Sequence, residues 1–214
     1  MKAAVKLTMA AAALAALGAC GNDAGGAGPL GVLAQTAGQV VAARRAPAPA
    51  APARSPAEAA AEALRVNPGP LIQAGFESLG RTQVMAMTGQ NGNMRTYMTP
   101  AEEALILRDG LLVGTRGLGN DLSVAEPGTA GAIRAGAGSG TRVMRYFSGD
   151  GLERPLRFDC TVAAGPRPGV TVEDCTGHGI SFQNSYAQQG GAIAVSRQWI
   201  GPAAGYVTIT TLRP

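Results

Sequence analysis

After residue 70 the sequence is divided at short intervals by residues that favour tight turns. The clearest are Asn91-Gly92, Asp109-Gly110 and Asp150-Gly151, and the stretch 165–169 adds two prolines between two glycines. Asn-Gly and Asp-Gly tolerate the positive φ angles that two-residue hairpin loops require. Apolar residues concentrate between the turns, often at alternating positions, as in antiparallel strands. The predicted strands are 71–78, 82–88, 94–98, 103–108, 111–116, 142–147, 154–163, 170–175, 179–186, 192–200 and 205–212.

Two helical patterns precede these strands. Apolar residues recur at helical spacing over 30–44, and the residues 55–58 (Ser-Pro-Ala-Glu) have the composition of a capping box that opens a helix ending near Val66. The stretch 117–141 is rich in Gly and Ala, so we expect a long loop there with a brief helix near 128–135. The sequence therefore predicts an all-β fold of mainly antiparallel sheet, half-barrel or sandwich-like, with one or two short N-terminal helices.

The Asp109-Gly110 turn makes the most specific prediction of register. A two-residue loop there pairs Leu107 with Leu112 and Ile106 with Val113, so both faces of the hairpin are apolar. A strand pair that is apolar on both faces is normally covered on both sides. We expect the N-terminal helices to provide this cover.

Residues 1–19 have the pattern of a secretory signal peptide. Two lysines precede an uncharged run, 7–17, which as a helix spans roughly 16 Å and is too short for the ~30 Å hydrocarbon core. The sequence Leu-Gly-Ala-Cys at 17–20 resembles the bacterial lipobox, which implies a lipid on Cys20. The alternative is an ordinary signal peptide followed by an incidental cysteine. Because Gly21, rather than Asp, follows the cysteine, the resemblance implies sorting to the periplasmic face of the outer membrane.

We expect three regions in the chain. They are the signal peptide (1–19), a tether with short helices and an Ala/Pro linker (20–66), and a β-rich periplasmic domain (67–214). Losing the two lysines with the signal lowers the formal charge from +4 to +2, and the remaining basic residues are scattered arginines. Nucleic-acid-binding proteins concentrate positive charge on one face, so we expect no nucleic-acid partner. No second apolar run is long enough to span a membrane, so the lipid is the anchor we expect.

Cys160 and Cys175 are an even pair left over in an oxidising compartment, which favours a disulfide. If residues 167–168 form the loop tip, the two cysteines lie directly opposite across a hairpin, within reach of a disulfide. Val170 and Val172 then fall on the opposite face from Cys175, and we expect a bulge near 173–174 to correct this. Metal binding is the rival use of the thiols, but it needs three or four ligands and the chain has one histidine, so we expect no metal site.

Residues that could carry catalysis do not converge in the sequence. His178 is the single histidine, and no Gly-x-Ser-x-Gly nucleophile motif accompanies it. Glu102-Glu103 and Glu173-Asp174 are adjacent pairs, so on strands their carboxylates point to opposite faces. Asp109 and Asp150 are explained as turn residues. We therefore expect no catalytic residue, no cofactor and no enzymatic activity.

Arg116, Arg197 and Trp199 are the candidates for a recognition surface. Arg and Trp together clamp sugars or peptides through guanidinium hydrogen bonds and cation–π contacts. The structural alternative is that Trp199 belongs to the core and that Arg197 pairs with a carboxylate on a strand.

The same segments carry a family resemblance. The sequence looks like the YjbF/GfcB lipoproteins, also called group 4 capsule polysaccharide lipoproteins, in several ordered motifs. These motifs are Asn91-Gly92, 107–122 (LRDGLLVGTRGLGNDL), 157–161 (RFDCT), 196–202 (SRQWIGP) and 205–209 (GYVTI). The resemblance implies an all-β lipoprotein that serves exopolysaccharide or capsule secretion, with an outer-membrane β-barrel of the same system as its neighbour.

The leading hypothesis is therefore a non-enzymatic accessory factor in polysaccharide assembly or export, which could contact the polysaccharide itself. Two rivals stay open. A polysaccharide-modifying enzyme needs a cleft with convergent carboxylates, and a lipid or lipoprotein carrier of the half-barrel type needs a large apolar cavity beneath a curved sheet.

Overall fold

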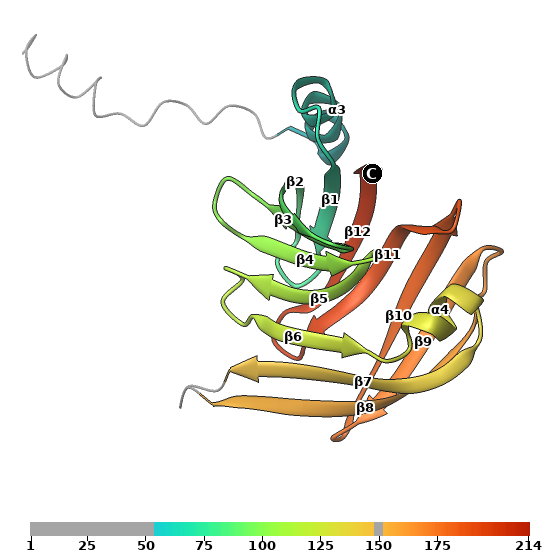
Figure 1. Ribbon diagram of the computed structural model, residues 1–214. Coiled ribbons are helices and arrows are strands. Elements are labelled where there is room, and N and C mark those ends of the chain that lie inside the picture. The colour runs from blue at the N-terminus through green and yellow to red at the C-terminus, as the bar shows by residue number, and fades with distance from the viewer. Residues whose placement is uncertain (1–53, 148–151) are drawn as a thin grey trace, which may run out of the picture. The chain divides into compact units, whose positions relative to one another are not determined.

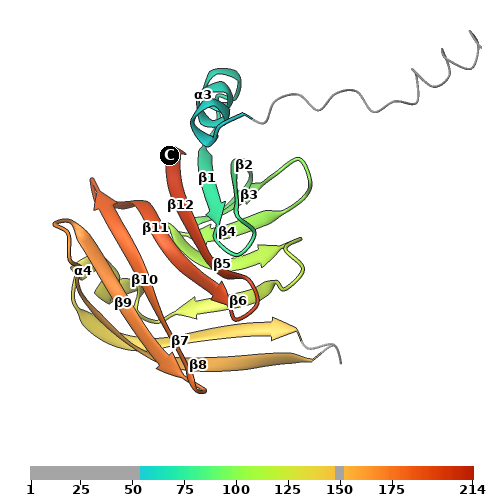
Figure 2. The same ribbon diagram turned by 180° about the vertical axis from the view of Figure 1, so that it is seen from behind.

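The computed structural model of the protein describes residues 54–147 and 152–214, most of which form one antiparallel sheet (Figures 1 and 2). The sheet confirms the prediction of an all-β fold. The signal peptide, Cys20, the helix expected over 30–44, most of the Ala/Pro linker and the Asp150-Gly151 turn lie outside the described residues. The twelve strands are β1 Leu71–Phe76, β2 Arg81–Asn91, β3 Met94–Met98, β4 Ala104–Arg108, β5 Leu111–Arg116, β6 Leu122–Pro127, β7 Gly138–Phe147, β8 Glu153–Ala164, β9 Val170–Gly177, β10 Ile180–Gln189, β11 Ala192–Gly201 and β12 Gly205–Arg213.

The sheet is rolled into a nearly closed, barrel-like form. Its strand order is β5-β4-β3-β2-β1-β12-β11-β10-β9-β8-β7-β6, so consecutive strands are neighbours apart from β5 and β6, and β1 also lies beside β12. The two strands at the ends of this order, β5 and β6, lie side by side (Figure 1). Of the two expected architectures, half-barrel and sandwich-like, the chain is therefore closer to the half-barrel.

Side chains, rather than a regular ladder, join β5 to β6. The Leu122 amide donates to the Thr115 hydroxyl at 2.9 Å, and that hydroxyl donates to the Asp121 carboxylate at 2.8 Å. The Arg116 guanidinium donates to the carbonyl oxygens of Leu122 at 3.2 Å and of Ser123 at 3.4 Å. These bonds replace the backbone pairing that is missing at the seam where the sheet closes.

The stretch 117–141 corrects the expectation of a long loop. It contains the strand β6, the helix α4 (Ala130–Ala135) and the start of β7, and only the brief helix agrees with the prediction. Glycine is needed for close packing here rather than for flexibility. A Cβ added to Gly140 would lie 3.0 Å from the carbonyl oxygen of Gly128, so the two chain segments approach closely only without that side chain.

The Asp109-Gly110 turn is confirmed, and one of its two predicted pairs is correct. Both residues have positive φ angles, 50° and 83°, as a type I′ turn requires. Leu107 faces Leu112 as predicted, but a register shift between Ile106 and Leu107 places Ile106 opposite Gly114 instead of Val113.

The cover of this hairpin differs from the expectation. Strand β5 is buried from Leu111 to Thr115 because β6 and β11 lie against it and because Leu111 packs with Ile133 of α4. The helix α3 (Pro56–Val66) instead contacts β1, β2 and β12. A strand at the end of the sheet order thus acquires two apolar faces because the sheet closes on itself.

Helix α3 begins where its capping residues predict. The Ser55 hydroxyl accepts the Glu58 amide at 3.3 Å, and the Glu58 carboxylate accepts the Ser55 amide at 2.8 Å, which is a complete capping box. Neither helix of the described chain has the length and apolarity that a membrane crossing needs.

The disulfide between Cys160 and Cys175 is confirmed. The two residues are direct partners on β8 and β9, with Cα atoms 4.1 Å apart. The bulge expected near 173–174 is wrong, because the register stays continuous on both sides of Cys175. Glu173 therefore shares the inward face with Cys175 and is fully buried, while Val172 faces the other side.

Aromatic side chains fill the interior beside the disulfide. Phe182 stacks on Trp199 with ring centroids 4.3 Å apart, and Phe158 meets both rings edge-on. All three residues are buried and belong to the main apolar core. The middle of the rolled sheet is therefore packed, and open space is found elsewhere.

Candidate functional site

A cavity of about 770 Å³ opens where the β2–β3, β4–β5 and β10–β11 hairpins meet helix α4. This volume is within the range of small-molecule sites in proteins. Its wall combines apolar residues with amides, hydroxyls and charged groups. The apolar side chains are Ile72, Leu107, Leu111, Ile133 and Ile193, and the polar ones are Gln90, Asn93, Arg95, Tyr97, Asp109, Arg134, Gln188, Gln189 and Thr211.

Polar contacts hold α4 as one wall of this cavity. Arg134 of α4 pairs with Asp109 at 2.9 Å, and the Asn93 amide donates to the same carboxylate at 2.7 Å. The Gln188 side chain of β10 donates to the Ile133 carbonyl at 2.8 Å. The helix is too short to be stable alone, so these contacts and the burial of Ile133 fix its position.

Arg95 enters the cavity from the inward face of β3. It lies opposite Leu107 in the ladder and two residues before Tyr97, and both of these side chains are buried. Arg95 itself is half-buried and has no ion pair or side-chain hydrogen bond within the described residues. The site thus contains one paired arginine, Arg134, and one arginine without a counterion in the described chain.

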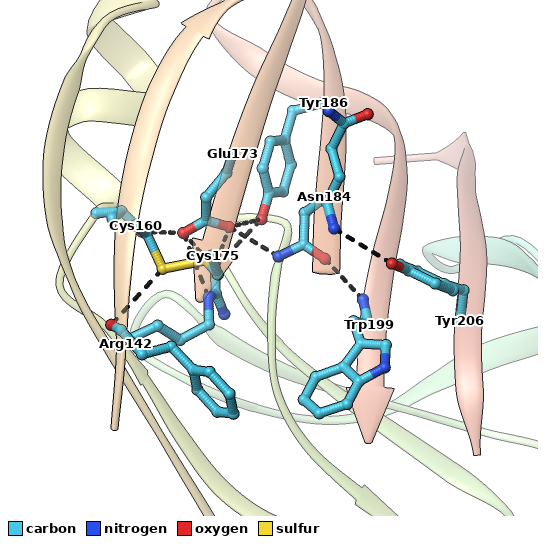
Figure 3. Close-up of a disulfide and its surroundings, with 11 residues drawn as sticks. Arg142, Cys160, Glu173, Cys175, Asn184, Tyr186, Trp199 and Tyr206 are labelled. Carbon is cyan, nitrogen blue, oxygen red and sulfur yellow. Dashed lines mark hydrogen bonds and ion pairs between the residues drawn. A yellow bond between two sulfur atoms is a disulfide. The ribbon is translucent and has the colours of Figure 1, made fainter. Parts of the chain in front are cut away.

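A second polar cluster lies in the interior next to the disulfide (Figure 3). The Glu173 carboxylate accepts Arg142 at 2.8 Å, Asn184 at 2.7 Å and Tyr186 at 2.8 Å, and also the Thr129 hydroxyl. Every one of these side chains is buried. The charged and polar groups of this cluster are paired with one another, so the cluster presents no free group to a ligand.

The pKa values of this cluster follow from burial and pairing. Burial alone raises the pKa of Glu173, but the Arg142 charge and the hydrogen bonds from Asn184, Thr129 and Arg142 outweigh it, so the pKa lies below its ordinary value. Burial raises the pKa of Tyr186, which stays a neutral donor to the carboxylate. The Glu173 carboxylate and the Arg142 guanidinium therefore both remain charged at neutral pH.

Cys160, Cys175 and Glu173 place possible ligand atoms within 4.8 Å of one another. The two sulfurs are bonded to each other, and the carboxylate is already surrounded by donors. Metal coordination by cysteine requires thiolates, so these residues do not fit a metal ion as they stand.

The predicted recognition residues are not brought together. Arg116 is exposed, but its guanidinium closes the seam between β5 and β6. Arg197 is partly exposed, binds Glu77 through two hydrogen bonds of 2.6 and 2.7 Å, and lies 3.5 Å over the Tyr206 ring. The contacts of Arg116 and Arg197 are those expected of structural arginines. A recognition role for either residue stays a prediction.

Trp199, the third candidate for the recognition surface, is buried. Its side chain is 7% exposed, and its amide donates to the Asn184 side chain at 2.7 Å. The strand β11 has an irregular register between Trp199 and Gly201, and both Trp199 and Ile200 are buried there. Trp199 is therefore a core residue, as the structural alternative stated.

The acidic residues and the histidine considered for catalysis lie apart. His178 is exposed at the β9–β10 turn with a φ of 53°, and its Nε2 accepts the Arg157 amide at 3.1 Å. Glu103 binds Arg81 and Gln83, and hydrogen bonding to Arg81 lowers the pKa of the Glu103 carboxyl. Asp109 is the turn residue that was expected, and it is also part of the cavity wall.

Neither Arg95 nor the cavity was predicted from the sequence. The available signal was strand parity: Arg95 and Tyr97 are two residues apart on the strand predicted over 94–98, so they share one face. If the aromatic residue faces inward, the arginine does too. The other walls come from segments as distant in sequence as Ile72 and Thr211, which no local pattern connects.

No curated protein matches the chain. Among solved structures, the hypothetical lipoprotein YmcC from Escherichia coli K12 has a similar fold, with a TM-score of 0.60 and 19% sequence identity over 73% of this chain and 89% of that one. The family described as group 4 capsule polysaccharide lipoprotein GfcB, YjbF matches residues 34–212. The chain therefore belongs to the YjbF/GfcB family of group 4 capsule polysaccharide lipoproteins.

Proposed function

We propose that this protein is an outer-membrane-anchored periplasmic lipoprotein that acts as a non-enzymatic accessory factor in the assembly or export of capsule or exopolysaccharide. The family match and the lipobox-like sequence ending at Cys20 support this proposal. An outer-membrane β-barrel of the same secretion system is the partner we propose. The lipid places the β-rich domain at the membrane face where such a channel would open.

The observation that carries the non-enzymatic part is the charge content of the cavity. Among the described residues that line it, Asp109 is the one with a carboxylic acid in its side chain, and that carboxylate is bound to Arg134 and Asn93. Cleavage of a glycosidic bond ordinarily needs two carboxylic acids, one to protonate the leaving group and one to act as nucleophile or base. The lining therefore supports binding rather than hydrolysis.

The packed interior argues against the lipid-carrier rival. Phe158, Phe182 and Trp199 occupy the middle of the rolled sheet, where a carrier would need apolar space for acyl chains. The cavity that does open, at the hairpin end, has polar side chains between its apolar ones. This mixture fits a hydrated ligand better than a hydrocarbon chain.

A gene deletion tests the proposal. We expect less surface and secreted polysaccharide, continued synthesis of intracellular precursor, and restoration by the wild-type gene. The Cys20→Ser variant serves as the matched control for anchoring, because it leaves the β-rich domain unchanged. We expect it to lose fatty-acid labelling and to restore export poorly. Normal export in the deletion strain, or hydrolysis of the polymer by the purified protein, would refute the proposed function.

A further inference from the structure

We propose that the cavity beside α4 binds a segment of an acidic saccharide, with the Arg95 guanidinium holding a sugar carboxylate. This inference rests on the proposed function and names the class of ligand that the cavity takes.

Of the two arginine side chains that line the cavity, one has no ion pair within the described chain. The Asp109 carboxylate is paired with Arg134, whereas Arg95 has no acidic partner within the described residues. An arginine is charged at every physiological pH, and a partly buried charge without a partner costs free energy. An anion that enters the cavity removes this cost, so the site favours anionic over neutral ligands.

The guanidinium suits a carboxylate in particular. Its planar donors form two parallel hydrogen bonds with the two oxygens of one carboxylate, which adds geometric specificity to the charge. The ladder pairs of β3 with β4 hold the backbone of Arg95, and the buried Tyr97 and Leu107 fix which face it occupies. A uronic acid or a similar acidic sugar presents this group.

The rest of the wall matches a sugar more closely than a lipid. Gln189 and Thr211 supply an amide and a hydroxyl that pair with sugar hydroxyl groups. Leu111, Ile193 and Tyr97 supply apolar contacts for the C–H faces of the rings. An acyl chain would leave the polar groups of the wall without hydrogen-bond partners, which is unfavourable.

Calorimetric titration of the mature lipoprotein in detergent tests the inference. The probes are an oligogalacturonate, a neutral malto-oligosaccharide of the same length and dihexanoyl phosphatidylglycerol, which carries an anionic headgroup on short acyl chains. Three variants accompany the wild type. Arg95→Gln removes the charge, Ala194→Phe fills the cavity while keeping Arg95, and Arg167→Gln removes an exposed arginine at the β8–β9 turn as the matched control.

We expect the wild type to bind the oligogalacturonate and the neutral sugar to bind much more weakly. Arg95→Gln should weaken binding of the acidic sugar by about tenfold or more, since a charged hydrogen bond is lost. Ala194→Phe should also weaken this binding, and Arg167→Gln should leave it unchanged. If Arg95→Gln fails to fold, as its circular dichroism would show, Ala194→Phe still tests the site.

Four outcomes would overturn the inference. They are equal binding of the neutral sugar, binding of phosphatidylglycerol alone, affinity that neither cavity variant changes, and no binding of any probe. The deletion phenotype is a separate measurement. A strain that fails to export polysaccharide while the protein binds no probe would retain the proposed function and refute this ligand.

Discussion

Replacing Glu173 with glutamine removes the charge that faces Arg142 while nearly preserving the volume of the side chain. The Arg142 side chain is 3% exposed and lies 2.8 Å from the carboxylate. At this distance, and with an effective dielectric constant of ~20, the attraction amounts to about 6 kcal/mol. Relaxation and water entry recover part of such a loss, and removing one partner of a buried pair costs about 3–5 kcal/mol. We expect Glu173→Gln to lower the free energy of unfolding by that amount.

Urea unfolding at pH 7 with the disulfide intact measures the effect. Trp199 is the single tryptophan and is buried, so its fluorescence reports the transition directly. Asp174→Asn is the matched control, because Asp174 is exposed and bound to Gln183, and its effect should stay within about 0.5 kcal/mol. The double variant Arg142→Met/Glu173→Gln should be more stable than Glu173→Gln alone, because the uncompensated guanidinium is gone.

The same pair predicts a pH dependence. Because folding lowers the pKa of Glu173, its contribution is complete above the unfolded pKa, about 4.3, and is lost as the pH falls through the lower folded value. The difference in unfolding free energy between wild type and Glu173→Gln should therefore shrink as the pH falls below about 4. A loss of less than 1 kcal/mol at pH 7, or a difference that ignores pH, would contradict the role assigned to Glu173.

Three further variants test other parts of the structure. Cys175→Ser should lower the free energy of unfolding by roughly 3 kcal/mol in urea, and an unchanged midpoint after reduction of the wild type would argue against a stabilising disulfide. Gly177→Ala should cost about 1–3 kcal/mol in the same assay, because the new Cβ would lie 2.5 Å from the Arg157 carbonyl oxygen. Arg197→Ala should cost about 1 kcal/mol or less, since its bond to Glu77 is partly exposed, yet it should reduce surface polysaccharide; a larger loss of stability would identify a structural residue.

Much of the strand pattern could be predicted from local sequence. Apolar alternation and turn residues located the strands from β1 to β5 and from β7 to β12, although several ends moved by a few residues. The strand β6 was missed because it is short and lies in a stretch rich in glycines, which was predicted to be a loop. Those glycines serve close contacts, such as that between Gly128 and Gly140, which only the folded chain reveals.

The cysteine hairpin shows how far a one-dimensional argument reaches. The loop position alone placed Cys160 opposite Cys175, because a regular ladder keeps the register that its turn sets. The inward position of Glu173 contradicted the apolar pattern and suggested a bulge. What allows Glu173 to face inward is the charge of Arg142 on β7, which the sheet places beside it. A local sequence pattern does not contain this contact.

The sequence by itself determined most of the secondary structure, the disulfide and the resemblance to a family, because each depends on spacing along one segment or on the order of segments. Only the tertiary structure decided which arginines form ion pairs or hydrogen bonds and where a cavity remains. Arg116 and Arg197 bind partners in other segments of the chain, and Trp199 is buried in the core. Arg95 faces a cavity lined by three hairpins and α4. These outcomes depend on the closure of the sheet, which brings together side chains that share no local periodicity.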